Sequence, residues 1–319
     1  MKAVDAATPR RFKVAEAEGT TRLDQFLTAQ LPELSRARVQ QLVRAGHATI
    51  DGRVVQRPAT RVGVGSEVGL LVPASEAAEA GLKPAPRIEF GLIHEDASIL
   101  VVDKPAGLVV HPAVGHLDDT LVHAIRARYP DVAQAFAGSE TAQRPGIVHR
   151  LDRDTSGAMV VARNPTAAAS LMAQFKARSV HKTYVAIARG DVQPPAGLID
   201  APVGRDPLHR QRMRAVAGGR EARTAFRVIE AVEGYSLLEL KPETGRTHQI
   251  RVHLKAVGHP VVGDPVYGRT DPHIDRLALH AWRLAFAHPA DGRAASFTSP
   301  LPSDMERALA EMGFLQRPG

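Results

Sequence analysis

One stretch of the chain, residues 144–163, combines apolar runs with a dense set of charged and hydroxyl side chains. Residues 146–148 and 158–162 are short, β-branched and flanked by proline or glycine, so they predict two buried strands. The polar side chains between them are those of His149, Arg150, Asp152, Arg153, Asp154, Thr155 and Ser156. A carboxylate between Arg150 and Arg153 is expected to stay ionised, as a nucleophile or general base requires.

A simpler interpretation of the same loop is a strand-to-strand turn. In that case Asp154, Thr155 and Ser156 would supply side-chain hydrogen bonds, and Gly157 would supply a permissive backbone. Residue types and spacing do not decide between the two interpretations. They also do not choose between Asp152 and Asp154 as a reactive carboxylate.

The wording of residues 149–157, His-Arg-Leu-Asp-Arg-Asp-Thr-Ser-Gly, resembles the signature of the large-subunit-RNA pseudouridine synthases of the RluA/RluD type. In that family the Asp directly after Arg-Leu is the essential catalytic residue, which implies Asp152. The Arg of this motif can occupy the position that a flipped base leaves, which implies Arg150.

A second motif surrounds Tyr184. Residues 181–188 alternate as a strand, and a lone strand Tyr is often a core residue with a satisfied hydroxyl. The family resemblance instead implies that Tyr184 stacks under the target base.

A third motif covers residues 243–254, where Thr247 is predicted to cap a helix that ends at Gly258. Its expected inner face is Ile250, Leu254 and Val257. The resemblance implies that Arg251 pairs with the catalytic Asp, keeps it ionised and fixes its orientation. The alternative is that Arg251 pairs with some other carboxylate and serves folding.

The resemblance also implies a set of substrate contacts around these three motifs. Lys104 and His111 lie in a segment that is consistent with a turn between strands. The same segment also matches a family sequence motif that lies beside the cleft. The basic stretch of residues 205–223 reads either as solvated surface or as a mobile loop that holds folded RNA. The implied substrate-binding residues are His149, Arg150, Thr155, Ile250, Arg246, Lys104 and His111.

The N-terminal part predicts a small module of its own. Helical spacing gives a first helix after a Thr20 or Thr21 cap, a second helix from Ser35 to Gly46, and a hairpin around Asp51-Gly52. This pattern resembles the small RNA-binding module first seen in a ribosomal small-subunit protein. The resemblance implies RNA contacts by Arg22, Arg36, Arg38 and Arg44, although such arginines are usually a solvated face.

The fold class expected is α+β: a mixed, largely antiparallel β-sheet catalytic domain split by an RNA-binding cleft, with a two-helix-and-hairpin module before it. The predicted boundaries are residues 1–19 as a disordered lead-in, 20–73 as the module, 74–87 as a linker and 88–319 as the catalytic domain. Within the catalytic domain, residues 166–178 predict a helix with Met172 facing inward, and residues 130–142 predict a loop.

Composition agrees with a polyanionic partner. The 319 residues carry a formal charge of +7 and no cysteine, which excludes disulfides and thiolate metal sites and fits a reducing compartment. No apolar run approaches the ~20 residues that span a bilayer. We therefore expect a cytoplasmic monomer that binds RNA and no membrane.

The function implied is isomerisation of specific uridines to pseudouridine in RNA, most simply large-subunit ribosomal RNA. Substrate and product are isomers, so neither a cofactor nor a metal is expected. Asp152 would attack the sugar, add to the base or abstract the 2′ proton, and the sequence leaves all three open. The alternatives are the same chemistry on transfer RNA, or a non-catalytic RNA-binding ribosome-assembly factor. A hydrolase is disfavoured because Ser156 lacks a nucleophile-elbow context.

Overall fold

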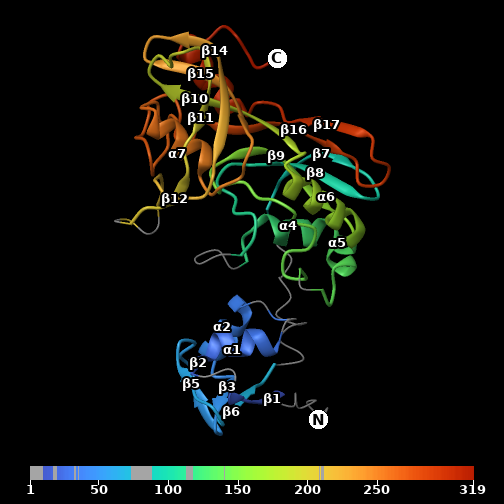
Figure 1. Cartoon of the computed structure of the whole chain (residues 1–319). Helices are drawn as coiled ribbons and strands as arrows, with labels where there is room; N and C mark the ends of the chain where they lie inside the picture. Colours follow the sequence, from blue (N-terminus) through green and yellow to red (C-terminus); the bar gives the residue numbers. More distant parts are fainter. Residues whose placement is uncertain are drawn as a thin grey trace. The chain divides into compact units, whose positions relative to one another are not determined.

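The computed structural model describes residues 10–16, 20–31, 34, 36–72, 88–112, 118–139, 141–207, 209 and 212–319. The chain divides into two compact units between residues 81 and 82 (Figure 1). The predicted linker, residues 74–87, lies outside the described residues, as do residues 1–9 of the predicted lead-in.

The N-terminal unit packs two helices on a small antiparallel sheet of order β1-β6-β3-β4, with β2 paired to β5. Its elements are β1 (Arg10–Lys13), β2 (Thr21–Arg22), α1 (Leu23–Gln30), α2 (Arg36–Arg44), β3 (Ala48–Ile50), β4 (Arg53–Val55), β5 (Arg61–Val62) and β6 (Glu67–Leu70). Asp51 and Gly52 both have positive φ, as the predicted two-residue hairpin turn requires, which confirms the hairpin.

Two expectations for this unit are wrong. Strand β1 lies within the predicted disordered lead-in, yet it pairs antiparallel with β6 from Arg10 to Lys13. Helix α1 follows Arg22, and no side chain caps it, so neither Thr20 nor Thr21 is its cap. Burial of Phe26, Leu27 and other apolar residues against α2 and the sheet therefore stabilises α1 in place of a cap.

The second unit is built on a nine-stranded sheet of order β11-β14-β15-β10-β16-β9-β8-β7, with β17 paired to β16. The pairing of β9 with β16 is parallel, and the other pairings described in this sheet are antiparallel. The strands are β7 (Gly91–Glu95), β8 (Ile99–Lys104), β9 (Ser156–Ala162), β10 (His181–Arg189), β11 (Ala196–Asp200), β14 (Arg223–Val232), β15 (Tyr235–Pro242), β16 (Leu279–Ala287) and β17 (Ala294–Thr298), and a separate pair is β12 (Val203–Arg205) and β13 (Met213–Ala215). The expected mixed, largely antiparallel α+β fold is confirmed.

Two hydrophobic cores lie along this sheet, and they divide its helices between them. One core joins β8 and β9 to α4 (Leu121–Arg128), α5 (Pro130–Ala135) and α6 (Pro165–Ala177). The other joins β10, β15 and β16 to α7 (Gln249–Ala256) and α8 (Ser303–Glu311). Tyr184 packs against both cores, so its strand marks the seam between them.

Several local predictions fail for identifiable reasons. Residues 146–148 are not a strand, because Ile147 makes a single bridge to Val161. The predicted loop at 130–142 contains α5, which begins at a proline in the first helical turn. Met172 is 50% exposed and Val257 45% exposed, so both point away from the cores they were expected to fill.

Helix starts and the basic stretch also differ from expectation. Helix α7 begins after His248 in a left-handed conformation, with no side-chain cap, so Thr247 is not the cap. Residues 205–223 are not one loop, because they contain β13, which pairs with β12 at their N-terminal end.

Candidate active site

The loop that carries Asp152 is held at both ends by close backbone packing. Before it, Ile147 bridges to Val161, and after it β9 begins at Ser156. Gly157 has a φ of 116°, and a Cβ there would collide with the carbonyl of Ala281 on the parallel neighbour β16. A glycine is therefore required where the loop enters the sheet, and it fixes the position of the residues before it.

Asp152 faces a buried guanidinium from a distant segment. Arg251 Nη1 donates to Asp152 Oδ2 at 3.3 Å. The other edge of the same guanidinium binds Asp264. Arg251 Nε donates to Asp264 Oδ2 at 2.7 Å, and Nη2 donates to Oδ1 at 2.8 Å. Arg251 is 3% exposed and Asp264 fully buried. Arg251 therefore makes a two-point pairing with Asp264 and a single hydrogen bond to Asp152, and it serves both the fold and Asp152.

Arg150 and Arg153, which flank Asp152 in the sequence, both have other hydrogen-bond partners. Arg153 Nε donates to Asp154 at 2.9 Å, so that pair is self-contained. Arg150 Nη1 lies 3.3 Å from His111 Nε2. The second neighbour of Asp152 is instead the imidazole of His248, with Nε2 4.0 Å from Oδ2.

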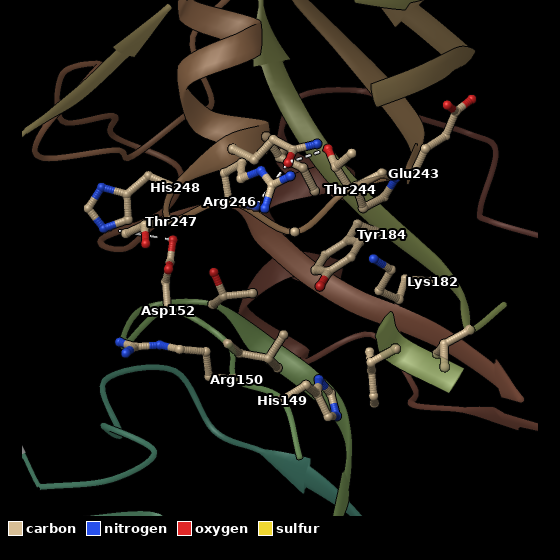
Figure 2. Close-up of a pocket in the computed structure, with 18 of the residues that line it drawn as sticks. His149, Arg150, Asp152, Lys182, Tyr184, Glu243, Thr244, Arg246, Thr247 and His248 are labelled. Atoms are coloured by element: carbon tan, nitrogen blue, oxygen red, sulfur yellow. Dashed lines mark hydrogen bonds and ion pairs between the residues drawn. The ribbon is translucent and has the colours of Figure 1, made fainter. Parts of the chain in front are cut away.

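Tyr184 lies on β10 where the strand is irregular. The pairing of β10 with β16 shifts register between Thr183 and Tyr184. Such bulges re-aim side chains and are frequent beside active sites. Burial, and to a smaller degree the charge of Asp152, raises the pKa of Tyr184, so its phenol stays neutral. Figure 2 shows Tyr184 and Asp152 directed toward the same open space.

These side chains line one cavity of about 560 Å³, within the usual range for ligand pockets. The predicted site residues that it brings together are Asp152, Tyr184, Arg251, His149, Arg150, Thr155, Ile250 and Arg246. Its wall carries seven Lys or Arg residues against the carboxylates Asp152 and Glu243, which suits an anionic ligand. Lys182 and Arg178 also line it, and apart from their charge no feature of the sequence marks them as pocket residues.

His149 closes one side of this pocket as a neutral ring. Its Nε2 accepts the backbone N–H of Val160 at 3.0 Å, and the ring stacks on Phe175 with centroids 4.6 Å apart. Burial, with a smaller effect of Lys182, lowers the pKa of His149 to about 3. We conclude that His149 shapes the pocket wall and carries no charge at neutral pH.

Lys104 is wrongly predicted as an RNA contact, because its side chain is fully buried. Its Nζ donates to the carbonyls of Pro105, Leu108 and Arg153 at 2.8, 2.8 and 2.9 Å. These bonds use all three protons of an ammonium group, although burial lowers the pKa of Lys104 to about 7. The residue ties the β8 turn to the loop directly after Asp152.

Replacing Lys104 by Met should destabilise the fold by about 3 kcal/mol or more, since three buried carbonyls lose their donor. Urea unfolding would measure this, with Lys176→Met as the control because Lys176 is an exposed pocket residue. Unfolding midpoints that agree for Lys104→Met and the parent protein would contradict the assigned role.

The other predicted contacts lie outside this pocket. His111 is partly buried, and its Nε2 faces Arg150. In the N-terminal unit, Arg22 and Arg36 both donate to the buried carboxylate of Asp24, at 2.9 and 3.0 Å. Arg44 is exposed, whereas the side chain of Arg38 lies outside the described part of the structure.

Comparison with known proteins decides the family. A family model described as RNA pseudouridylate synthase matches residues 98–256. An uncharacterized RNA pseudouridine synthase from Chloroflexus aurantiacus is 47% identical over 308 residues, covering 96% of this chain and 94% of that protein. The chain belongs to the RNA pseudouridylate synthase family. The predicted family membership is confirmed.

Further similarities extend over both units. An S4 domain model matches residues 21–68, so the N-terminal unit contains an RNA-binding S4 domain. The ribosomal large subunit pseudouridine synthase D of Pseudomonas aeruginosa is 44% identical, covering 90% of each chain. The solved human RNA pseudouridylate synthase domain containing 1 is 32% identical with a TM-score of 0.56, covering 69% of this chain and 86% of that one. The protein is therefore an RNA pseudouridine synthase, an isomerase that acts on RNA. None of its described helices is long and apolar enough to cross a membrane.

Proposed function

We propose that this synthase converts specific uridines of large-subunit ribosomal RNA to pseudouridine, with the carboxylate of Asp152 as the reacting group. The target is supported by relatives named ribosomal large subunit pseudouridine synthase D, which are 38–44% identical over most of the chain. The observation that carries the chemistry is the single pocket in which Asp152, Tyr184 and Arg251 meet.

The reaction requires a uridine extruded from its stack, because the reacting atoms are otherwise covered. The bond from the sugar carbon 1′ to base nitrogen 1 breaks, the base turns, and a bond from 1′ to carbon 5 forms. Carbon 5 loses a proton and nitrogen 1 gains one, so no atom or electron enters or leaves overall. Tyr184 supports the uracil plane, and the exposed Arg150 takes the position that the base vacates.

Asp152 acts as an anion in each of three routes. It attacks carbon 1′, adds to the base, or takes the 2′ proton of the sugar. Arg251 places a guanidinium hydrogen bond on the carboxylate at 3.3 Å and fixes its orientation. The cationic wall of the pocket holds the phosphates on either side of the target nucleotide.

A pseudouridine map of total RNA, from cells with and without the gene, tests the proposed target. We expect a small number of large-subunit ribosomal positions to lose the modification and to regain it on complementation. Loss confined to transfer RNA would replace the proposed substrate. No loss anywhere would support a non-catalytic assembly factor.

A further inference from the structure

The segment Asp264 to Tyr267 holds both groups that face Asp152. Asp264 Oδ1 accepts the backbone N–H groups of Val266 and Tyr267 at 2.9 and 3.0 Å, and both its oxygens bind Arg251. The hydroxyl of Tyr267 lies 2.8 Å from Nδ1 of His248. This segment reads from the sequence as a structural turn, yet it touches both neighbours of the proposed reacting group.

His248 is held in an unusual backbone conformation. Its φ of 57° lies in the left-handed region, which costs a non-glycine residue free energy and persists only where the surrounding structure imposes it. The conformation places the imidazole at the start of α7 with Nε2 4.0 Å from Asp152 Oδ2 (Figure 2). The ring also packs edge-on against the ring of Tyr267, with centroids 5.6 Å apart.

The hydrogen bonds of the Tyr267 hydroxyl indicate which tautomer His248 adopts. The hydroxyl oxygen of Tyr267 accepts the backbone N–H of Met213 in β13 at 2.9 Å. The Met213 N–H occupies one acceptor site of the hydroxyl oxygen and leaves the hydroxyl proton available, so we infer that the hydroxyl donates to His248 Nδ1. A neutral imidazole that accepts at Nδ1 carries its proton on Nε2, the nitrogen that faces Asp152.

We propose that His248 is a positioning residue that presents its Nε2–H to Asp152, with its tautomer set by the hydroxyl of Tyr267. The inference rests on the proposed role of Asp152. The separation of 4.0 Å exceeds a hydrogen bond, and such contacts tighten when a substrate closes the site. The chain of contacts begins at Met213 in β13, which lies within the basic stretch of residues 205–223, so it links this stretch to the reacting carboxylate.

The charge state of His248 fits a neutral donor. Burial, as the largest cause, lowers the pKa of His248, while the nearby charges partly cancel. The titratable and charged groups that face it are Asp152, Arg251, Asp264, Arg150 and Tyr267. The Tyr267 hydroxyl stabilises the neutral ring further, so its removal should raise the pKa of His248 toward the ordinary value.

Single-turnover kinetics on saturating RNA, measured from pH 5 to 8 on the full-length protein, test this proposal. Tyr267→Phe and His248→Leu should each lower the rate about 10-fold, the effect of one weak hydrogen bond to a charged group, while the RNA Kd changes less than twofold. Protonation of Nδ1 breaks the Tyr267 hydrogen bond and puts a full positive charge beside Asp152, which weakens this carboxylate as a nucleophile or base, so the acidic limb of Tyr267→Phe should move to higher pH. His248→Gln, which keeps an N–H donor, should retain more activity than His248→Leu and should lose the histidine limb.

Tyr235→Phe is the matched control, because this hydroxyl also donates a hydrogen bond, to Asp271 at 3.1 Å, outside the pocket. It should keep the parental pH profile. Unchanged rates and profiles in both His248→Leu and Tyr267→Phe would overturn the proposal, as would a defect confined to RNA binding. If the Tyr267→Phe protein does not fold, comparison of His248→Leu with His248→Gln still tests whether His248 acts as a donor to Asp152. An active Asp152→Asn protein would instead refute the proposed function itself.

Discussion

Replacing Asp152 by Asn is expected to abolish conversion of uridine to pseudouridine while the fold and RNA binding persist. The amide has the shape of the carboxylate, but it carries no charge and can neither attack carbon 1′ nor take a proton. Removing an essential reacting group costs about 10⁴-fold or more in rate. The fold should tolerate the change because Arg251 keeps its two-point pairing with Asp264. Primer extension on carbodiimide-treated RNA measures the product.

Asp154→Asn is the matched control for this prediction. Asp154 lies two residues away in the same loop and pairs with Arg153, outside the pocket. Its loss should lower the rate less than about 10-fold, because an exposed ion pair contributes little. Equal defects in the two variants would show that the loop, rather than the carboxylate of Asp152, is what catalysis needs.

Replacing Arg251 by Met is expected to damage both stability and catalysis. It leaves Asp264 buried without its cation, and such a loss costs about 3–5 kcal/mol. In the parent protein, burial opposes ionisation but the Arg251 hydrogen bonds prevail, so the pKa of Asp264 is lowered. That lowered pKa contributes stability above the unfolded value of about 4, and the contribution is lost as the pH falls. Without Arg251 the sign reverses, so the variant should become relatively more stable in mild acid. Urea unfolding at pH 5 and 8 measures this.

The double variant Arg251→Met, Asp264→Asn separates the two roles of the arginine. It removes the unpaired buried charge and should recover part of the lost stability. It should not recover activity, because Asp152 still lacks its guanidinium. A double variant that regains both stability and the parental rate would contradict a catalytic contribution by Arg251. Arg276→Met, which breaks the half-buried pair with Asp304 outside the pocket, controls for stability loss alone.

The sequence identifies the motif residues of the site but not the groups that support them. Asp152, Tyr184 and Arg251 come from three separate segments, and the structure brings them to one pocket. The pairing of Asp264 with Arg251 and the position of His248 beside Asp152 depend on tertiary contacts between segments. Residue spacing within one segment does not encode such contacts. The bulge that places Tyr184 is likewise a property of the pairing of β10 with β16.

Residue chemistry is also insufficient at Lys104, where a positive charge beside a cleft motif predicts a ligand contact. Burial and three carbonyl acceptors make it internal instead, a choice that depends on the fold around it. For α5 the signals were present, since Pro130 stands at the first helical position and Asp131 in the first turn. Met172 shows a further limit, because apolar spacing alone does not establish which helical positions are covered.

Release of tritium from RNA labelled at carbon 5 of its uridines tests the central claim most directly, because only formation of the new carbon–carbon bond frees that label. Large-subunit ribosomal RNA made without modification is the substrate, and RNA binding is measured on the same samples. We expect release by the parent protein and by Asp154→Asn, and none by Asp152→Asn at equal RNA occupancy. Release by Asp152→Asn at the parental rate would contradict the assignment of the reacting carboxylate.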